Sequence, residues 1–105
     1  MSLTVPTAKV KLLIVVAPFE LADHLAADFK KLGVSGYSHM RTDGVGAHGP
    51  RTYGVLDGAN VRFEIVGSAD LVRKVLAHVV TELKDRAVTA YAMDVEAVPA
   101  DHFGG

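Results

Sequence analysis

A glycine-rich segment with basic residues holds the groups best suited to binding a ligand. It runs from Gly44 to Gly54 and reads Gly-Val-Gly-Ala-His-Gly-Pro-Arg-Thr-Tyr-Gly, with His48 and Arg51 as ionisable donors. Glycines permit positive φ and a close approach of the main chain to a ligand. Successive main-chain amides in such a turn can form an anion-binding concavity, and an arginine can hold a phosphate through two hydrogen bonds. The alternative is a flexible hairpin tip whose glycines serve only the turn.

Other kinds of chemistry have less support in the residues. The chain has no cysteine, five histidines and a formal net charge of -1. Disulfides, thiolate chemistry and cysteine-ligated zinc are excluded, and the small net charge disfavours nucleic-acid binding. His24 and His78 are expected on solvent faces of different helices, and no two histidines have the i, i+4 spacing of a helical zinc site. We predict no metal site, and without a paired nucleophile and base we predict no catalysis and no catalytic cofactor.

The length and composition predict one globular domain over residues 1–105, since half of the residues are hydrophobic. We expect a core over about residues 10–97, a leader over 1–9 and a tail over 98–105. No apolar run approaches the ~20 residues that span a bilayer, and Leu12–Ala17 is too short for a signal peptide. The expected compartment is the cytoplasm.

The spacing of apolar residues predicts four strands and two helices. The strands are expected over 10–16, 36–42, 61–66 and 89–97, and the helices over 20–32 and from Ser68, as N-cap, to about Leu83. The order strand, helix, strand, strand, helix, strand is that of an α+β, ferredoxin-like βαββαβ sandwich, in which two helices cover one face of the sheet. The glycine-rich segment then forms a long loop between the second and third strands.

The first strand needs cover on both of its faces. Leu12, Ile14 and Val16 point one way, while Leu13 and Val15 point the other. The two helices can bury only one of these sets, and bare apolar faces of that size are uncommon on monomers. We therefore expect a homo-oligomer.

With the loop and the topology in place, the chain resembles the PII signalling family over about residues 10–96. Four segments stand in register with family motifs: Ala17-Pro18-Phe19 with Lys-Pro-Phe, Gly33-Val34-Ser35-Gly36 with Gly-Val-Thr-Gly, Gly44-Val45-Gly46 with Gly-Phe-Gly, and Val61–Val66 with Val-Lys-Ile-Glu-Ile-Val. The resemblance implies a homotrimer that binds nucleotides in clefts between subunits. It also implies that the long loop, the T-loop of the family, docks on a transporter or an enzyme.

Several positions depart from the family pattern. Arg86-Ala87-Val88-Thr89 replaces the Gly-Asp-Gly-Lys loop that grips phosphates, and Ala100 and His102 replace the C-terminal arginines. His48 stands where the family has a glutamine for magnesium and 2-oxoglutarate, and Asn60 stands for a T-loop lysine. These departures argue against tight magnesium-ATP and 2-oxoglutarate sensing.

A divergent branch fits better, namely the PII-like proteins associated with carboxysomes and bicarbonate transporters. Like them, the chain has Gly44-x-Gly46 followed by Arg51, a Gly36-Tyr37-Ser38 strand and a tail with Asp101-His102-Phe103. This resemblance implies a non-enzymatic signalling protein that binds AMP, ADP or cyclic AMP and regulates inorganic-carbon uptake or carboxysome function through its T-loop. It also implies bicarbonate as a second ligand, at His48 and Arg51, and recruitment to the inner membrane through a transporter.

The predicted nucleotide site combines the loop, the end of the third strand and the segment after the second helix. Its residues are Thr42, Gly44, Val45, Gly46, His48, Arg51, Val66, Arg86, Ala87, Val88 and Thr89. Arg51 is expected to hold phosphate, whereas Arg86 either completes the phosphate site or only favours the helix C-terminus. Two other classes of protein stay open: a small ferredoxin-like enzyme with an active site at the subunit interface, and a structural trimer that binds no nucleotide.

Overall fold

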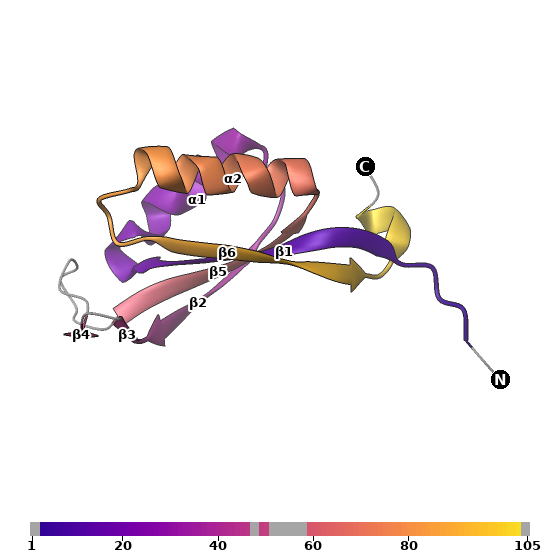
Figure 1. Ribbon diagram of the computed structural model, residues 1–105, viewed down its shortest axis with the longest axis horizontal. Helices are drawn as coiled ribbons and strands as arrows, with labels where there is room; N and C mark the ends of the chain where they lie inside the picture. Colours follow the sequence, from indigo (N-terminus) through magenta and orange to yellow (C-terminus); the bar gives the residue numbers. More distant parts are fainter. Residues whose placement is uncertain (1–2, 47–48, 51–58, 104–105) are drawn as a thin grey trace.

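A four-stranded antiparallel sheet carries two helices on one face (Figure 1). The computed structural model describes residues 3–46, 49–50 and 59–103. The strands lie in the order β2-β5-β1-β6, with β1 at Ala8–Pro18, β2 at Ser38–Asp43, β5 at Ala59–Gly67 and β6 at Thr89–Ala97. The predicted α+β, ferredoxin-like sandwich is confirmed.

The helical segments and the loop complete the chain. Helix α1 spans Ala22–Leu32 after a 3-10 turn at Phe19–Leu21, helix α2 spans Ala69–Glu82, and a second 3-10 turn lies at Ala100–His102. Between β2 and β5, the two-residue strands β3, Val45–Gly46, and β4, Gly49–Pro50, pair with one another. No helix in the described ranges has the length and apolar character needed to cross a bilayer.

Local signals set the ends of the two helices. Gly33 ends α1 with a φ of 99°, which favours glycine, and its N–H donates to the carbonyl of Lys30. Ser68 caps α2, because its side-chain oxygen accepts a hydrogen bond of 3.1 Å from the N–H of Leu71. Both signals act over a few residues, so the sequence pattern predicted them.

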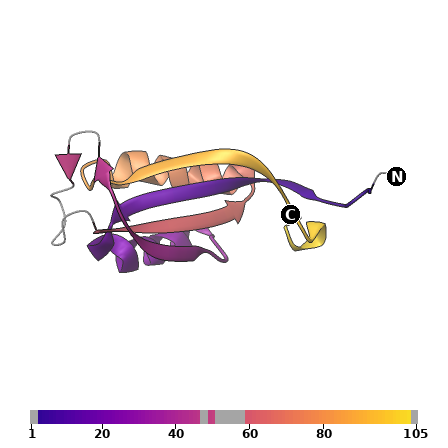
Figure 2. The same cartoon turned by 90° about the horizontal axis from the view of Figure 1, so that it is seen from below.

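The strand β1 begins two residues earlier than predicted. Ala8 and Lys9 pair with Ala97 and Glu96 of β6, which extends the two strands together beyond the helices (Figure 2). The strand β2 begins at Ser38 instead of Gly36.

The core lies between the sheet and the helices. Leu13 and Val15 of β1 are completely buried there, and Phe63 of β5 packs edge-to-face on Phe29 of α1 at 5.0 Å between ring centroids. Helix α2 contributes Val72, Val75 and Val79. Val80 of the same helix points away from the core and is 67% exposed.

On the helix-free face of the sheet, exposed apolar side chains lie among polar ones such as Arg62 and Glu64. Ile14 is fully buried on this face, where its neighbours across the strands are Glu64 and Tyr91. Four large apolar side chains on the same face are exposed: Met40, Val66, Tyr91 and Met93. Nothing in the described part of this chain covers them.

Candidate functional site

The base of the loop is built around a buried amide. Thr42 of β2 pairs with Asn60 of β5, whose residue surface is only 2% exposed. A Cβ atom on Gly44 would lie 3.4 Å from Asn60 Nδ2. That distance is an ordinary van der Waals contact, so packing over Asn60 does not require glycine at position 44, and Gly44 does not adopt the positive φ that the sequence suggested.

The rest of the loop is described in part. Val45 and Gly46 form β3 and pair with Pro50 and Gly49. His48 and Arg51, the two side chains predicted to hold phosphate and bicarbonate, lie outside the described residues. Their roles stay predictions.

The segment 86–89 forms the turn between α2 and β6. Arg86 is exposed, and its N–H donates to the Leu83 carbonyl at 3.0 Å. Ala87 has a φ of 57°, a left-handed conformation that is uncommon for a residue with a Cβ. Val88 is partly buried and packs against the core, and Thr89 begins β6 opposite Val16.

The base of the loop and the turn at 86–89 lie at the same end of the sheet but on opposite edges. The strands β5 and β1 lie between β2 and β6, so about 14 Å separates the two edge strands at the usual strand spacing. Within one chain, the turn at 86–89 and the base of the loop therefore do not form a single phosphate site.

A cavity of about 470 Å³ lies at the other end of the sheet, where β2 begins and β5 ends. Val66 lines it, alone among the predicted site residues that the structure describes. Its further apolar lining comes from Leu71 and Phe103, and its polar side chains are those of Ser35, Tyr37, Ser38, Glu64, Ser68 and His102. No lysine or arginine of the described residues lines it.

The sequence analysis missed most of this cavity. Ser38 and Glu64 are paired across β2 and β5, so both face the side of the sheet that also carries Val66. The alternation of side chains along a strand puts Glu64 and Val66 on one face, so the sequence could have indicated that Glu64 lies near Val66. The contribution of His102 and Phe103 depends on how the tail folds back, and spacing in the sequence does not reveal that.

The predicted residues therefore fall into two groups at opposite ends of the sheet. Asn60, at the base of the loop, and Val66, in the cavity, are six residues apart on β5, which corresponds to about 20 Å. A nucleotide in contact with both groups of one chain would have to lie along the length of the sheet. A second subunit could bring the two ends together over a shorter distance.

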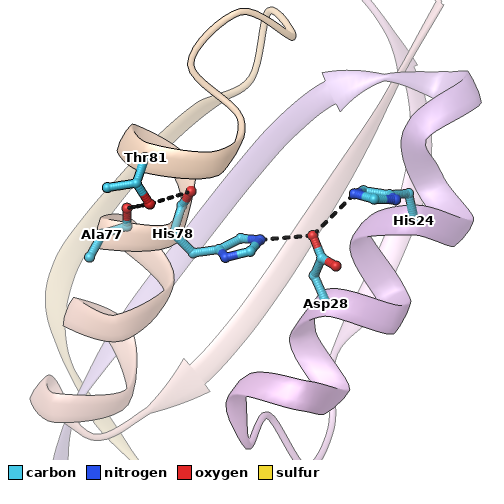
Figure 3. A network of polar contacts seen from close by, with 5 residues as sticks. All are labelled: His24, Asp28, Ala77, His78 and Thr81. Atoms are coloured by element: carbon cyan, nitrogen blue, oxygen red, sulfur yellow. Dashed lines mark hydrogen bonds and ion pairs between the residues drawn. The ribbon is translucent and has the colours of Figure 1, made fainter.

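The outer faces of the helices hold a polar network that the sequence did not predict (Figure 3). His78 of α2 lies 2.8 Å from Asp28 Oδ2 of α1, and His24 lies 3.3 Å from the same oxygen. His78 is therefore only partly exposed, contrary to the expected solvent-facing position. In the part of the chain that the structure describes, no group of three such side chains is arranged to hold a metal ion.

The α+β sandwich thus has the β2–β5 connection at one end of the sheet and, at the other, a cavity whose described lining includes Glu64 but no lysine or arginine. Residues 10–100 match the family model of the nitrogen regulatory protein P-II. The chain belongs to the PII family. A comparison with curated proteins gave no match.

Three solved structures illustrate the range of sequence identity and TM-score among proteins with this fold. A candidate PII-like signalling protein from Thermus thermophilus is 26% identical, with a TM-score of 0.75 over 92% of this chain and 97% of that chain. CPII, a nitrogen regulatory PII-like protein from Thiomonas intermedia K12 bound to ADP, AMP and bicarbonate, is 16% identical, with a TM-score of 0.74 over 88% and 96%. The GlnK-ATP complex of B. subtilis is 15% identical, with a TM-score of 0.58 over 83% and 82%.

Proposed function

We propose that the chain is a non-enzymatic, trimeric PII-like signalling protein that binds an adenine nucleotide between subunits. Membership of the PII family supports the class of protein. The observation that carries the proposal is the position of Val66, which lines the cavity about 20 Å from the loop end of β5, where other predicted site residues lie. A neighbouring subunit supplies the missing half, and the exposed apolar face of Met40, Tyr91 and Met93 provides the surface for association.

The nucleobase occupies the cavity beside Val66. Glu64 can only accept hydrogen bonds when ionised, which suits the amino group of adenine. Serine hydroxyls together with apolar and aromatic side chains line the rest of the cavity, which suits a planar ligand with polar edges. The phosphates lie away from Glu64, because a carboxylate without a neighbouring cation repels them.

The phosphates occupy the loop end of the adjacent subunit. The backbone of Gly44–Gly46 and the guanidinium of Arg51 supply the donors there. Arg86–Thr89 lie at the other edge of that sheet, about 14 Å away, and their part in the site stays a prediction. Bicarbonate is the second ligand, at His48 and Arg51. CPII, which has the same fold, was solved with ADP, AMP and bicarbonate.

Ligand binding orders the loop and changes the surface that the loop presents to a partner. The partner is a membrane bicarbonate transporter or a protein of the carboxysome, so that the chain regulates inorganic-carbon uptake. The protein works in the cytoplasm and reaches the inner membrane through its transporter.

Calorimetry with AMP, ADP, ATP and cyclic AMP, each with and without bicarbonate, tests the proposal. We expect ATP to bind no more tightly than ADP, because Thr89, Ala100 and His102 replace the groups that would hold outer phosphates. Arg51→Ala should weaken AMP, ADP and cyclic AMP by about 1.5–3 kcal/mol, the contribution of a charge-assisted hydrogen bond. Arg73→Ala, on the exposed surface of α2, is the matched control and should leave the affinities unchanged.

Three results would contradict the proposal in different ways. ATP bound tenfold more tightly than ADP, or an unchanged affinity in Arg51→Ala, would place the phosphates elsewhere. Binding of none of the nucleotides would favour a structural trimer. Turnover of a bound nucleotide would favour an interfacial enzyme.

A further inference from the structure

The C-terminal turn brings two aromatic rings to the cavity at the end of β5. The N–H of His102 donates to the Pro99 carbonyl at 3.1 Å, and that of Phe103 donates to Ala100 at 3.3 Å, which fixes the turn. The rings of His102 and Phe103 pack edge-to-face with centroids 4.8 Å apart. Both residues line the cavity, and Phe103 is partly buried.

A third ring reaches the same cavity from the start of β2. Tyr37 packs edge-on against Phe63 at 5.3 Å and against Phe29 at 6.1 Å, both of which are fully buried core residues. The core therefore holds Tyr37 in position, although 42% of the residue is exposed. Rings held in this way bind planar bases by stacking, at low cost in conformational entropy.

The charges around the tail do not suit phosphate. The lining of the cavity includes the carboxylate of Glu64 and, within the described residues, no lysine or arginine. The tail itself brings Asp101 beside His102. A phosphate at this end would face the carboxylate of Glu64 with no lysine or arginine among the described lining residues, whereas a neutral base would face rings, hydroxyls and one hydrogen-bond acceptor.

We propose that the C-terminal turn of this chain is a base-binding element, in which Phe103 contacts the nucleobase and the tail holds no phosphate. The ligand that fits is a purine with an exocyclic amino group, its plane against the rings and its amino group toward Glu64. The inference rests on the proposed nucleotide-binding function and assigns a specificity role to the tail.

Calorimetry on two variants tests this role. Phe103→Leu keeps an apolar side chain and removes the ring, while Phe103→Tyr keeps the ring. We expect Phe103→Leu to weaken AMP and ADP by the same factor, about tenfold, since the lost contact concerns the base that both share. Phe103→Tyr should retain most of the affinity for AMP and ADP. The control is Asp101→Ala, which lies in the same turn but outside the cavity lining and should bind like the wild type.

Pyrophosphate, which has no base, separates a base contact from a phosphate contact. A competition titration against ADP should give the same inhibition constant for pyrophosphate with wild type and Phe103→Leu. A pyrophosphate affinity that falls with the ADP affinity would overturn the inference, and so would unchanged AMP and ADP affinities in Phe103→Leu. If the wild type binds no nucleotide, the proposed function itself fails, which is a distinct result. Circular dichroism and light scattering on each variant identify any that is misfolded, and Phe103→Tyr then still tests whether a ring at this position sustains binding.

Discussion

Asp28 joins the two helices through a single carboxylate oxygen. Because an ionised carboxylate only accepts hydrogen bonds, the ring N–H of His78 is the donor at 2.8 Å, while His24 Nε2 lies 3.3 Å from the same oxygen as an ion-pair contact (Figure 3). The two contacts differ in exposure, since 56% of the His24 side chain and 20% of the His78 side chain are exposed. The contact between Asp28 and His78 should therefore account for most of the stabilisation.

We predict that Asp28→Ala lowers the free energy of unfolding by about 1–3 kcal/mol, because it leaves the partly buried His78 without this acceptor. His24→Ala is the matched control and should cost only a few tenths of a kcal/mol, as is usual for an exposed pair. Chemical denaturation at one fixed protomer concentration measures both values. Nucleotide affinity should not change, since these residues do not line the cavity. Equal losses of unfolding free energy in the two variants would contradict the prediction that the contact between Asp28 and His78 provides most of the stabilisation.

Residues on separate helices illustrate what the sequence could not predict. Asp28 and His78 are 50 positions apart, and their contact depends on how α1 and α2 lie side by side on the sheet. Val66 was predicted as a site residue, yet its neighbours Ser38 and Phe103 come from other segments of the chain. Sequence patterns show the spacing of residues within a helix or strand. Contacts between elements depend on how the elements pack, which these patterns do not show.

At the scale of elements, the sequence was more informative. The strand β6 has the predicted bounds, Thr89–Ala97, and Gly33 and Ser68 end and begin their helices as expected. These features depend on alternation and capping, which act over a few neighbouring residues. The early start of β1 was not predicted, because polar Lys9 is ordered by its pairing with Glu96.

We predict that Ser68→Ala destabilises the protein by about 1 kcal/mol, because the N–H of Leu71 loses its acceptor. Ser68→Asn keeps a side-chain oxygen that can cap α2, and it should restore most of the stability. Thermal unfolding at equal protomer concentration measures the two effects. If Ser68→Asn is as unstable as Ser68→Ala, the loss does not come from the cap.

For the whole molecule, the exposed apolar face of the sheet is the decisive feature. Tyr91 and Met93 on β6 are each 45% exposed on the face without helices. We predict that Tyr91→Asp dissociates the trimer, because burial of a carboxylate between apolar faces is unfavourable. Light scattering at micromolar concentration should give a trimer for the wild type and a monomer for this variant.

Val80→Asp is the matched control for this experiment. Val80 is more exposed than Tyr91, at 67%, but it lies on α2 and so on the opposite side of the sheet. The charge introduced is the same, and the variant should remain a trimer. A monomeric wild type, or dissociation of Val80→Asp, would refute the assignment of the subunit interface to the sheet.

Because the loop and the cavity lie at opposite ends of β5, the subunits of the proposed ring would all be arranged head to tail. In the proposed ring, each chain would contribute its cavity to the site shared with one neighbour and its loop to the site shared with the other, because these two features lie at opposite ends of β5. A closed ring of head-to-tail contacts has as many composite sites as subunits. If a chain with mutations in both its loop and its cavity assembled with intact chains, the two composite sites that it shares with its neighbours would be lost. In a trimer with one such chain, only the site between the two intact chains would remain.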